Sequence, residues 1–369
     1  QDLPAWRGVD AVTGQITDVA GLEALARDFP DSGSVRLRLL NAQLNAGDTR
    51  SALGSLAWLK LREHVFGEAT RAQILRLLEK AKLREAEALL LQRADVLEAS
   101  AVAYTFRSDF GLIESVIGPA AQGTHIATSI TGKAVVVGYS PASQTITRLP
   151  EADDVSGLVF DPATKYVWFA SSNLDGSVDR EPGFAGLIGI PPDSNNWRHV
   201  PLPAGAAISD LSIGADGTIY GSDPLNGGVY RKAREANLLE VFVAPGTFRS
   251  PQGSAVSADG KTLYISDYRY GLAMVDTASG KVSRLASDIP VMLDGIDGLW
   301  LFMGELIAVQ NGTSPMRISA FTLSEDGTRI TAARLLEQAH RGWTEPLGGS
   351  IDDGALVYVA TGQWDRYEQ

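Results

Sequence analysis

The sequence predicts a mainly β fold, namely a six-bladed β-propeller at residues 106–369 preceded by a small all-α, helical-repeat domain at residues 1–105. Two observations predict it. From residue 18 to about residue 103 the apolar residues recur with the period of helices. After Phe106, short apolar or aromatic runs alternate with Asp-Gly and other glycine turns in a unit that recurs six times, as propeller blades do.

Composition and charge exclude several classes of protein. The 369-residue chain carries a formal charge of −12, which argues against a nucleic-acid partner because such proteins usually present a basic face. No apolar run approaches the roughly 20 residues of a membrane span. The absence of cysteine excludes disulfides and thiolate ligands. The chain begins at Gln1 without methionine, as a processed exported protein does, so we expect a periplasmic or secreted location.

The first part of the chain contains one well-defined helix pair. Leu37, Leu40 and Leu44 form an apolar stripe on the first helix of the pair. We expect that helix to end at Gly47, because glycine adopts a left-handed C′ conformation at little cost. Asp48 then follows as an N-cap for the second helix.

Residues 30–63, which contain this pair, resemble a tetratricopeptide repeat in length and in their Ala46-Gly47-Asp48 turn. A weaker second unit is expected at residues 68–99. Helical repeats often present a concave face to a protein partner, whereas so few helices can also serve only to cover the propeller. Both roles remain open at this stage.

The repeating unit of the second part locates the candidate site. The residue that opens each unit should lie near the mouth of the central channel of a propeller. The units are spaced by about 34 to 54 residues, as blades of about four strands are. Six residues should therefore meet at the channel: Gln122, Ser156, Asp210, Gln252, Asp297 and Leu347.

Three stretches of residues 110–369 carry a family likeness: SPQGSAVSADGKTLYISDYRYGLAMVD, GIDGLWLFMGELIAVQNGTSPMRI and TEPLGGSIDDGALVYVATGQWDRY. They resemble the senescence marker protein / gluconolactonase / luciferin-regenerating enzyme family of six-bladed propellers. The second stretch is the most specific. The resemblance implies a divalent metal, usually calcium, at the channel mouth. Its ligands are a glutamate from the first blade, an asparagine from a middle blade and an aspartate from a later blade.

Residue by residue, the family pattern places its aspartate at Asp297, which doubles as the candidate general base for opening a lactone. Gln252 lies where the asparagine is expected, and Gln122 lies approximately where the glutamate is expected. Asp210 lies at a position close to metal or substrate. The resemblance therefore implies Asp297, Gln252, Asp210 and Gln122 as metal ligands.

The departures from the family pattern weaken this site. Calcium prefers anionic or carbonyl oxygens, and Gln122 in place of a glutamate removes one negative charge. Glu345 could replace that charge in space. A shift of two residues in the first blade would instead bring Thr124 and His125 to the ligand position.

Two further residues, Tyr268 and Arg269, follow the inner strands of the fourth unit and are expected to bind substrate at the channel mouth. Packing on the surface of the blade is the alternative for both. Asp210 and Asp297 also have a purely structural alternative, which is to bond to neighbouring strand amides.

Two functions follow from the sequence. The first is an exported propeller protein that binds a divalent cation and a small polar ligand and hydrolyses a lactone or ester. The second is a non-catalytic protein that recognises a protein or cell-envelope partner through its helices or its channel mouth. The extra helices and the two glutamines favour the second, whereas Asp210 and Asp297 favour the first.

Overall fold

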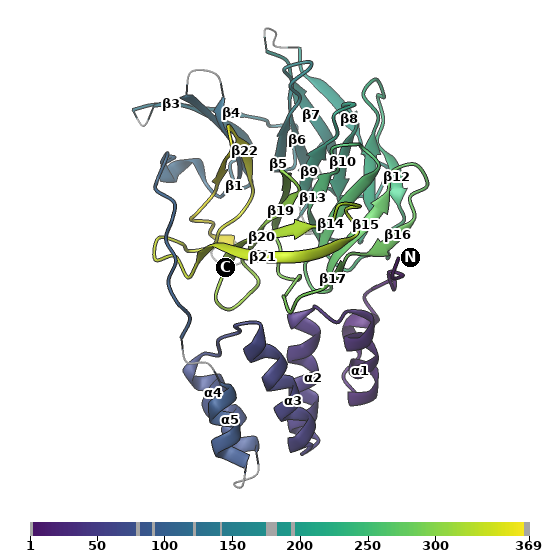
Figure 1. Cartoon of the computed structure of the whole chain (residues 1–369). Helices are drawn as coiled ribbons and strands as arrows, with labels where there is room; N and C mark the ends of the chain where they lie inside the picture. Colours follow the sequence, from purple (N-terminus) through teal and green to yellow (C-terminus); the bar gives the residue numbers. More distant parts are fainter. Residues whose placement is uncertain are drawn as a thin grey trace.

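The structure is a computed structural model that describes residues 3–78, 82–90, 93–120, 123–140, 142–174, 183–192 and 196–364. It is a mainly β propeller with a few helices at the N-terminus, which gather on one side of the sheets (Figure 1). The division into two domains at residue 105 stays a prediction. Among the described residues, no helix has the length and apolar character needed to cross a membrane.

Five α-helices lie within the first ninety residues, in the part of the chain that the structure describes. The α-helices are α1 (Val19–Asp28), α2 (Gly33–Asn45), α3 (Thr49–Leu61), α4 (Glu68–Leu77) and α5 (Leu83–Leu89). Two 3-10 turns, η1 (Thr13–Gln15) and η3 (Ser108–Phe110), flank them.

The helix pair α2 and α3 forms as the sequence predicts. Gly47 has a φ of 71° and reverses the chain after α2. The Asp48 carboxylate accepts the Ser51 N–H at 3.1 Å and so caps α3. Leu40 of α2 and Leu56 of α3 are buried in one shared core. The likeness to a tetratricopeptide repeat stays a prediction.

The helical part ends earlier than predicted. Residues 93–107 contain no helix, so the expectation of helix up to residue 103 is wrong there. Leu97 instead forms an antiparallel bridge with Gln338, and the Glu337 carboxylate accepts the backbone N–H groups of Ala99 and Ser100. The propeller therefore supplies the partners that a helix would have provided internally, and the segment stays extended.

The propeller strands pair as antiparallel neighbours in chain order. The first two sheets are β1 (Ile113–Ala120), β2 (Thr124–Ser129), β3 (Ala134–Ser140) and β4 (Ser143–Arg148), then β5 (Asp154–Phe160), β6 (Val167–Ser172), β7 (Gly186–Ile190) and β8 (Arg198–Pro201). The next two are β9 (Asp210–Ile213), β10 (Ile219–Ser222), β11 (Val229–Lys232) and β12 (Glu240–Val243), then β13 (Pro251–Val256), β14 (Thr262–Asp267), β15 (Gly271–Asp276) and β16 (Val282–Arg284).

The fifth sheet is larger and the last is smaller. The fifth contains β18 (Gly298–Phe302), β19 (Glu305–Gln310), β20 (Arg317–Leu323) and β21 (Arg329–Gln338), and β17 (Ala286–Ser287) pairs in parallel with β21. The last contains only β22 (Gly349–Asp352) and β23 (Ala355–Tyr358). The described residues therefore form five blades of four or more strands.

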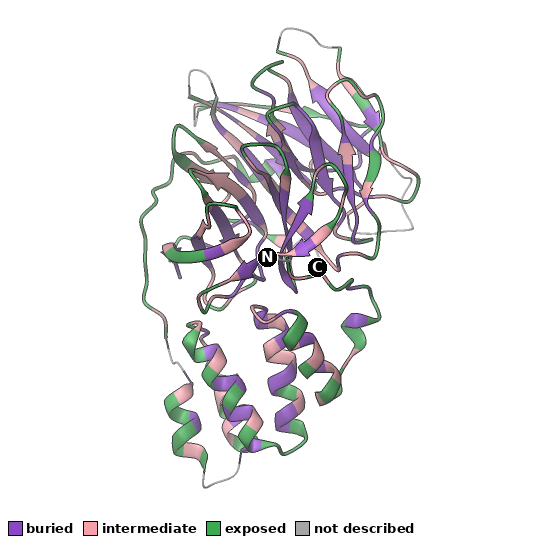
Figure 2. Ribbon diagram, turned by 45° about the vertical axis from the view of Figure 1, so that its right-hand side comes forward, coloured by how far each residue is buried: buried purple, intermediate pink, exposed green. Residues whose placement is uncertain are grey.

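The prediction of six blades is not confirmed, because the sixth unit is a two-stranded sheet. Its inner strand β22 nevertheless packs between β18 and β1, and the inner strands β1, β5, β9, β13 and β18 pack each against the next. The ring thus closes around a central axis. Many residues along the blade strands are buried (Figure 2). Their hydrophobic side chains form core clusters that join neighbouring blades.

The first blade starts earlier than predicted. The residues expected to open it, around Gln122, follow β1, and Gln122 itself lies outside the described residues. The inner strand is β1, which begins at Ile113, and the predicted copy corresponds to β2 and β3. The start of β1, Ile113-Glu114-Ser115, does not match the opening of the other units, so the first unit was placed at Gln122-Gly123 instead.

The helices dock on the loops at the ends of blades four and five. The Asp294 carboxylate accepts the N–H groups of Gly33 at 2.8 Å and Ser34 at 2.6 Å, so a propeller residue caps the N-terminus of α2. The Ser32 hydroxyl donates to the carbonyl of Arg269 at 2.6 Å. Val65 and Ser314 exchange two further bonds.

Candidate cation site at the ends of the inner strands

Four acidic side chains meet near the propeller axis. Glu114 lies in β1, Asp210 begins β9, Asp297 immediately precedes β18, and Glu345 precedes β22. We call these four residues the axial carboxylate cluster. They come from four different units of the ring, because corresponding ends of the inner strands converge on the axis.

Burial and the charges of neighbouring carboxylates act on these side chains. Burial, followed by the negative charges of Asp210 and Glu345, raises the pKa of Asp297 to about 8. The pKa of Glu114 lies well above its ordinary value because of burial and then the charge of Asp297, with smaller contributions from Asp210 and Glu345. Burial raises the pKa of Asp210 to about 7. The pKa values of three of the four carboxyl groups are thus raised above their ordinary range.

Asp210 and Asp297 have few compensating partners among the described residues. No arginine, lysine or histidine is among the causes given for the raised pKa values of these two groups. Asp210 accepts one bond, from the Leu211 N–H at 2.8 Å. In the part of the chain that the structure describes, no donor bonds to the carboxylate of Asp297, which is partly exposed. Carboxylate groups with few hydrogen-bond donors around them offer hard anionic oxygens to a cation.

The side chains of the cluster are not arranged as a complete metal-coordination site. Across the described residues, no three histidine, aspartate or glutamate side chains already surround one point closely enough to hold a metal ion. The donor chemistry fits a hard divalent cation, because all the charged donors are carboxylates and Gln252 adds an amide. Cation binding would have to draw the side chains together.

Sequence reasoning brought Asp210 and Asp297 together correctly but missed Glu114. The sequence assigned the first-blade position to Gln122. The structure places Glu114, which lies eight residues before Gln122 in the chain, at that position. The missing charge of the first blade is therefore present. The available signal was a lone glutamate inside the otherwise apolar run at the start of β1. Glu345, expected as a spatial substitute, also belongs to the cluster.

Other predicted channel residues vary in their placement. Gln252 lies in β13 beside Asp297, since the Gly253 N–H donates to the Asp297 carbonyl at 2.7 Å, and its own amide donates to Ser250. Ser156 is fully buried and bonds to the Ser209 carbonyl, and Leu347 is also buried, so neither forms part of the cluster.

Tyr268 and Arg269 lie in the turn between β14 and β15. The Tyr268 hydroxyl donates to Asn311 at 2.8 Å, and burial together with the charges of Asp297 and Glu345 raises the Tyr268 pKa. Tyr268 is therefore a neighbour of the cluster. Arg269 is exposed, and its backbone carbonyl contacts Ser32 of the helical part. Substrate binding by these two residues stays a prediction.

The C-terminal segment also reaches the cluster. The Trp364 indole N–H donates to the Glu114 carboxylate at 2.7 Å, and the Trp364 backbone N–H donates to the Glu345 carboxylate at 3.2 Å. An aromatic side chain is thus bonded to two of the four acidic residues.

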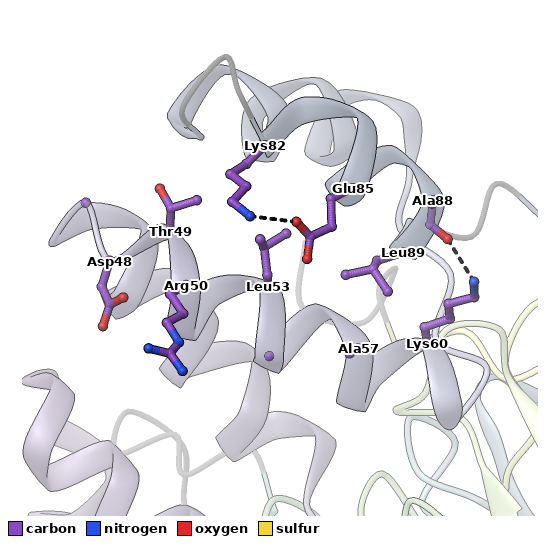
Figure 3. Close-up of a pocket in the computed structure, with 12 residues that line it drawn as sticks. Asp48, Thr49, Arg50, Leu53, Ala57, Lys60, Lys82, Glu85, Ala88 and Leu89 are labelled. Carbon is purple, nitrogen blue, oxygen red and sulfur yellow. Dashed lines mark hydrogen bonds and ion pairs between the residues drawn. The ribbon is translucent and has the colours of Figure 1, made fainter.

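The helical part has hollows of its own. A cavity of about 860 Å³ lies between α3 and α5, with Arg50, Leu53 and Leu89 among its lining (Figure 3). The Lys82 ammonium pairs with Glu85 at 3.0 Å, and the Lys60 ammonium donates to the Ala88 carbonyl at 2.8 Å. A second, smaller cavity lies among α1, α2 and α3.

Comparison with solved structures shows the propeller fold. A virginiamycin B lyase from Staphylococcus aureus is similar over 68% of this chain and 78% of its own, at 14% identity and a TM-score of 0.51. A chain of a nidogen/laminin complex is similar over 65% and 84%, at 13% identity and a TM-score of 0.50. A gluconolactonase from Xanthomonas campestris is similar over 68% and 83%, at 16% identity and a TM-score of 0.48.

Sequence comparison adds no family, since neither a protein-family model nor a curated protein matches the chain. The likenesses to the virginiamycin B lyase and to the nidogen/laminin chain are below 20% identity, so they establish the fold and no ligand or reaction. The chain is a β-propeller, and its function must be argued from its own residues.

Proposed function

We propose that the protein binds a divalent cation at the axial carboxylate cluster and a small polar ligand beside it. The observation that carries the proposal is the meeting of four carboxylates near the axis, where burial and then the charges of Asp210 and Glu345 raise the pKa of Asp297 to about 8. Charged groups in such surroundings normally have partners, and no donor among the described residues bonds to the Asp297 carboxylate, so Asp297 is a candidate for contact with a bound cation. Calcium suits the donor set best, because all the donors are oxygens.

The reaction we propose for this site is the hydrolysis of a lactone or related ester. When bound, a divalent cation would supply Lewis acidity toward the ligand carbonyl. Asp297 is the proposed general base, because its pKa of about 8 is close to the working range of such a group. Tyr268, held by Asn311 at the edge of the cluster, and Arg269 would orient the polar ligand.

The test is calorimetric titration of the metal-stripped protein with calcium, magnesium and zinc. We expect calcium to bind to the natural protein and to lose at least tenfold in affinity in Asp297→Asn. Asp326→Asn is the matched control, because Asp326 lies in an exposed turn of the same blade and bonds only to Ser324 and Thr328. Absence of cation binding by the natural protein would refute the proposal.

Hydrolysis is tested separately on a panel of lactones, with and without a chelator. Calcium binding without lactone turnover would leave a cation-dependent binding protein and remove the enzymatic part of the proposal. The periplasmic or secreted location stays a prediction.

A second candidate is a non-catalytic protein that recognises a protein partner through its helices. The observation that favours it is the position of the larger cavity, which lies on the helical part between α3 and α5 rather than on the propeller. Arg50→Glu would then abolish partner capture without changing calcium affinity.

A further inference from the structure

The C-terminal segment is anchored up to Gly362 and carries Trp364 just beyond the anchor. The Gly362 N–H donates to the Glu345 carbonyl at 2.8 Å, and its carbonyl accepts the Thr344 hydroxyl at 2.7 Å. A Cβ at Gly362 would meet Leu347 at 2.4 Å and the Glu345 carbonyl at 2.8 Å, so the close approach requires glycine. The chain is therefore fixed two residues before the indole.

The bonds made by Trp364 use the groups that a cation would use. Its indole N–H occupies an oxygen of Glu114, and its backbone N–H occupies an oxygen of Glu345. A hydrogen-bond donor and a metal ion compete for the same carboxylate lone pairs. The large ring also takes up space next to Glu114, on the strand that supplies the first blade's only acidic side chain to the cluster.

We propose that Trp364 closes the axial carboxylate cluster and is displaced when a divalent cation binds there. This inference rests on the proposed cation site and adds its regulation. The anchoring bonds of Gly362 to Thr344 and Glu345 precede Trp364 in the chain, so they can persist while the indole moves. In the structure, Glu114 is bonded to the indole, and the acidic side chains of the described residues do not surround one point.

The experiment compares calcium affinity in the natural protein, Trp364→Phe and a chain shortened after Gln363. Phenylalanine keeps an aromatic ring but lacks the N–H donor. A hydrogen bond to a charged group contributes enough that its loss should tighten calcium binding roughly tenfold. The shortened chain should bind at least as tightly as Trp364→Phe.

The matched control is Trp343→Phe. Trp343 is also a largely buried indole near the end of the chain, but its N–H donates to the Tyr358 hydroxyl at 2.9 Å. Calcium affinity should stay unchanged in this variant. Calcium should also shift the tryptophan fluorescence of the natural protein, and most of that shift should vanish in Trp364→Phe.

The outcomes separate this inference from the proposed function. Equal calcium affinity in the natural protein and both Trp364 variants would overturn the closing role while leaving the cation site intact. Weaker binding in both variants would also overturn it, since Trp364 would then support the bound cation. Failure of every variant to bind any cation would overturn both the site and its closure.

Discussion

Asp294 and Asp297 lie three residues apart in one stretch of chain and have opposite environments. The Asp294 side chain is 3% exposed, and both its oxygens accept backbone N–H groups at the start of α2. Asp297 faces other carboxylates, and no donor among the described residues bonds to the Asp297 carboxylate. One acid is thus bonded into an interface, and the other is left in a cluster of like charges.

The same contrast holds for the surroundings of the two residues. At the interface, Asp31 pairs with Arg62 and Arg284, and Arg62 also stacks on Trp58 at 3.8 Å. At the axial carboxylate cluster, no such cation is present in the described part of the chain. Buried acids with partners are what a stable interface needs, whereas acids without partners are typical of a site that binds a charged ligand.

The largest expected effect is the loss of folding stability when Asp294 is replaced. Asp294→Ala removes two charge-assisted hydrogen bonds and the cap of α2, so we expect the free energy of unfolding to fall by about 2–4 kcal/mol. Chemical denaturation measures it. Asp48→Ala, which removes an exposed cap inside the helical part, should cost less. Equal losses in the two variants would show that the interface bonds add nothing to an ordinary cap.

The next effect is a pH dependence of folding stability caused by His64, which lies at the same interface. Burial, followed by the charge of Arg317, lowers the pKa of His64 to about 4, against about 6.5 in an unfolded chain. Between these values the unfolded state binds a proton that the folded state does not. Stability should therefore fall as the pH drops from 6.5 toward 4, by on the order of 2–3 kcal/mol. His64→Gln should lose this part of the slope in denaturation curves recorded across that range; an unchanged slope would contradict the assignment.

A smaller effect is expected where the extended linker meets the propeller. Glu337 accepts two linker N–H groups and the Tyr358 hydroxyl at 2.7 Å. Glu337→Gln keeps the shape but weakens these bonds, and should lower the free energy of unfolding by about 1–2 kcal/mol. Hydrogen exchange at Ala99 and Ser100 should rise in parallel. Unchanged protection at both amides would contradict the role of Glu337.

Part of this architecture was predictable from the sequence. The Gly47-Asp48 turn and the Asp-Gly turns of the blades are local signals, because backbone conformation there depends on the residues themselves. Asp210 and Asp297 were located because each opens a recognisable unit. The first blade was missed because the residues around Glu114 at the start of β1 do not match that unit, so Glu114 was overlooked.

The contacts between distant segments were beyond prediction. The capping of α2 by Asp294, the bridge from Leu97 to Gln338 and the bond from Trp364 to Glu114 each join residues more than 200 positions apart. Their partners depend on how the helices and the C-terminal segment dock, which no local pattern encodes. The helical period likewise could not show that residues 93–107 would be held extended by the propeller.

The central claim is that the charge of Asp297 is unfavourable until a cation binds. Denaturation of the natural protein and of Asp297→Asn, each with chelator and with saturating calcium, tests it most directly. With chelator, Asp297→Asn should be the more stable by about 1 kcal/mol, because repulsion is relieved. With calcium at about 100 times its Kd, the natural protein should gain about 2.7 kcal/mol and become the more stable of the two. The same order of stability in both conditions would contradict the account.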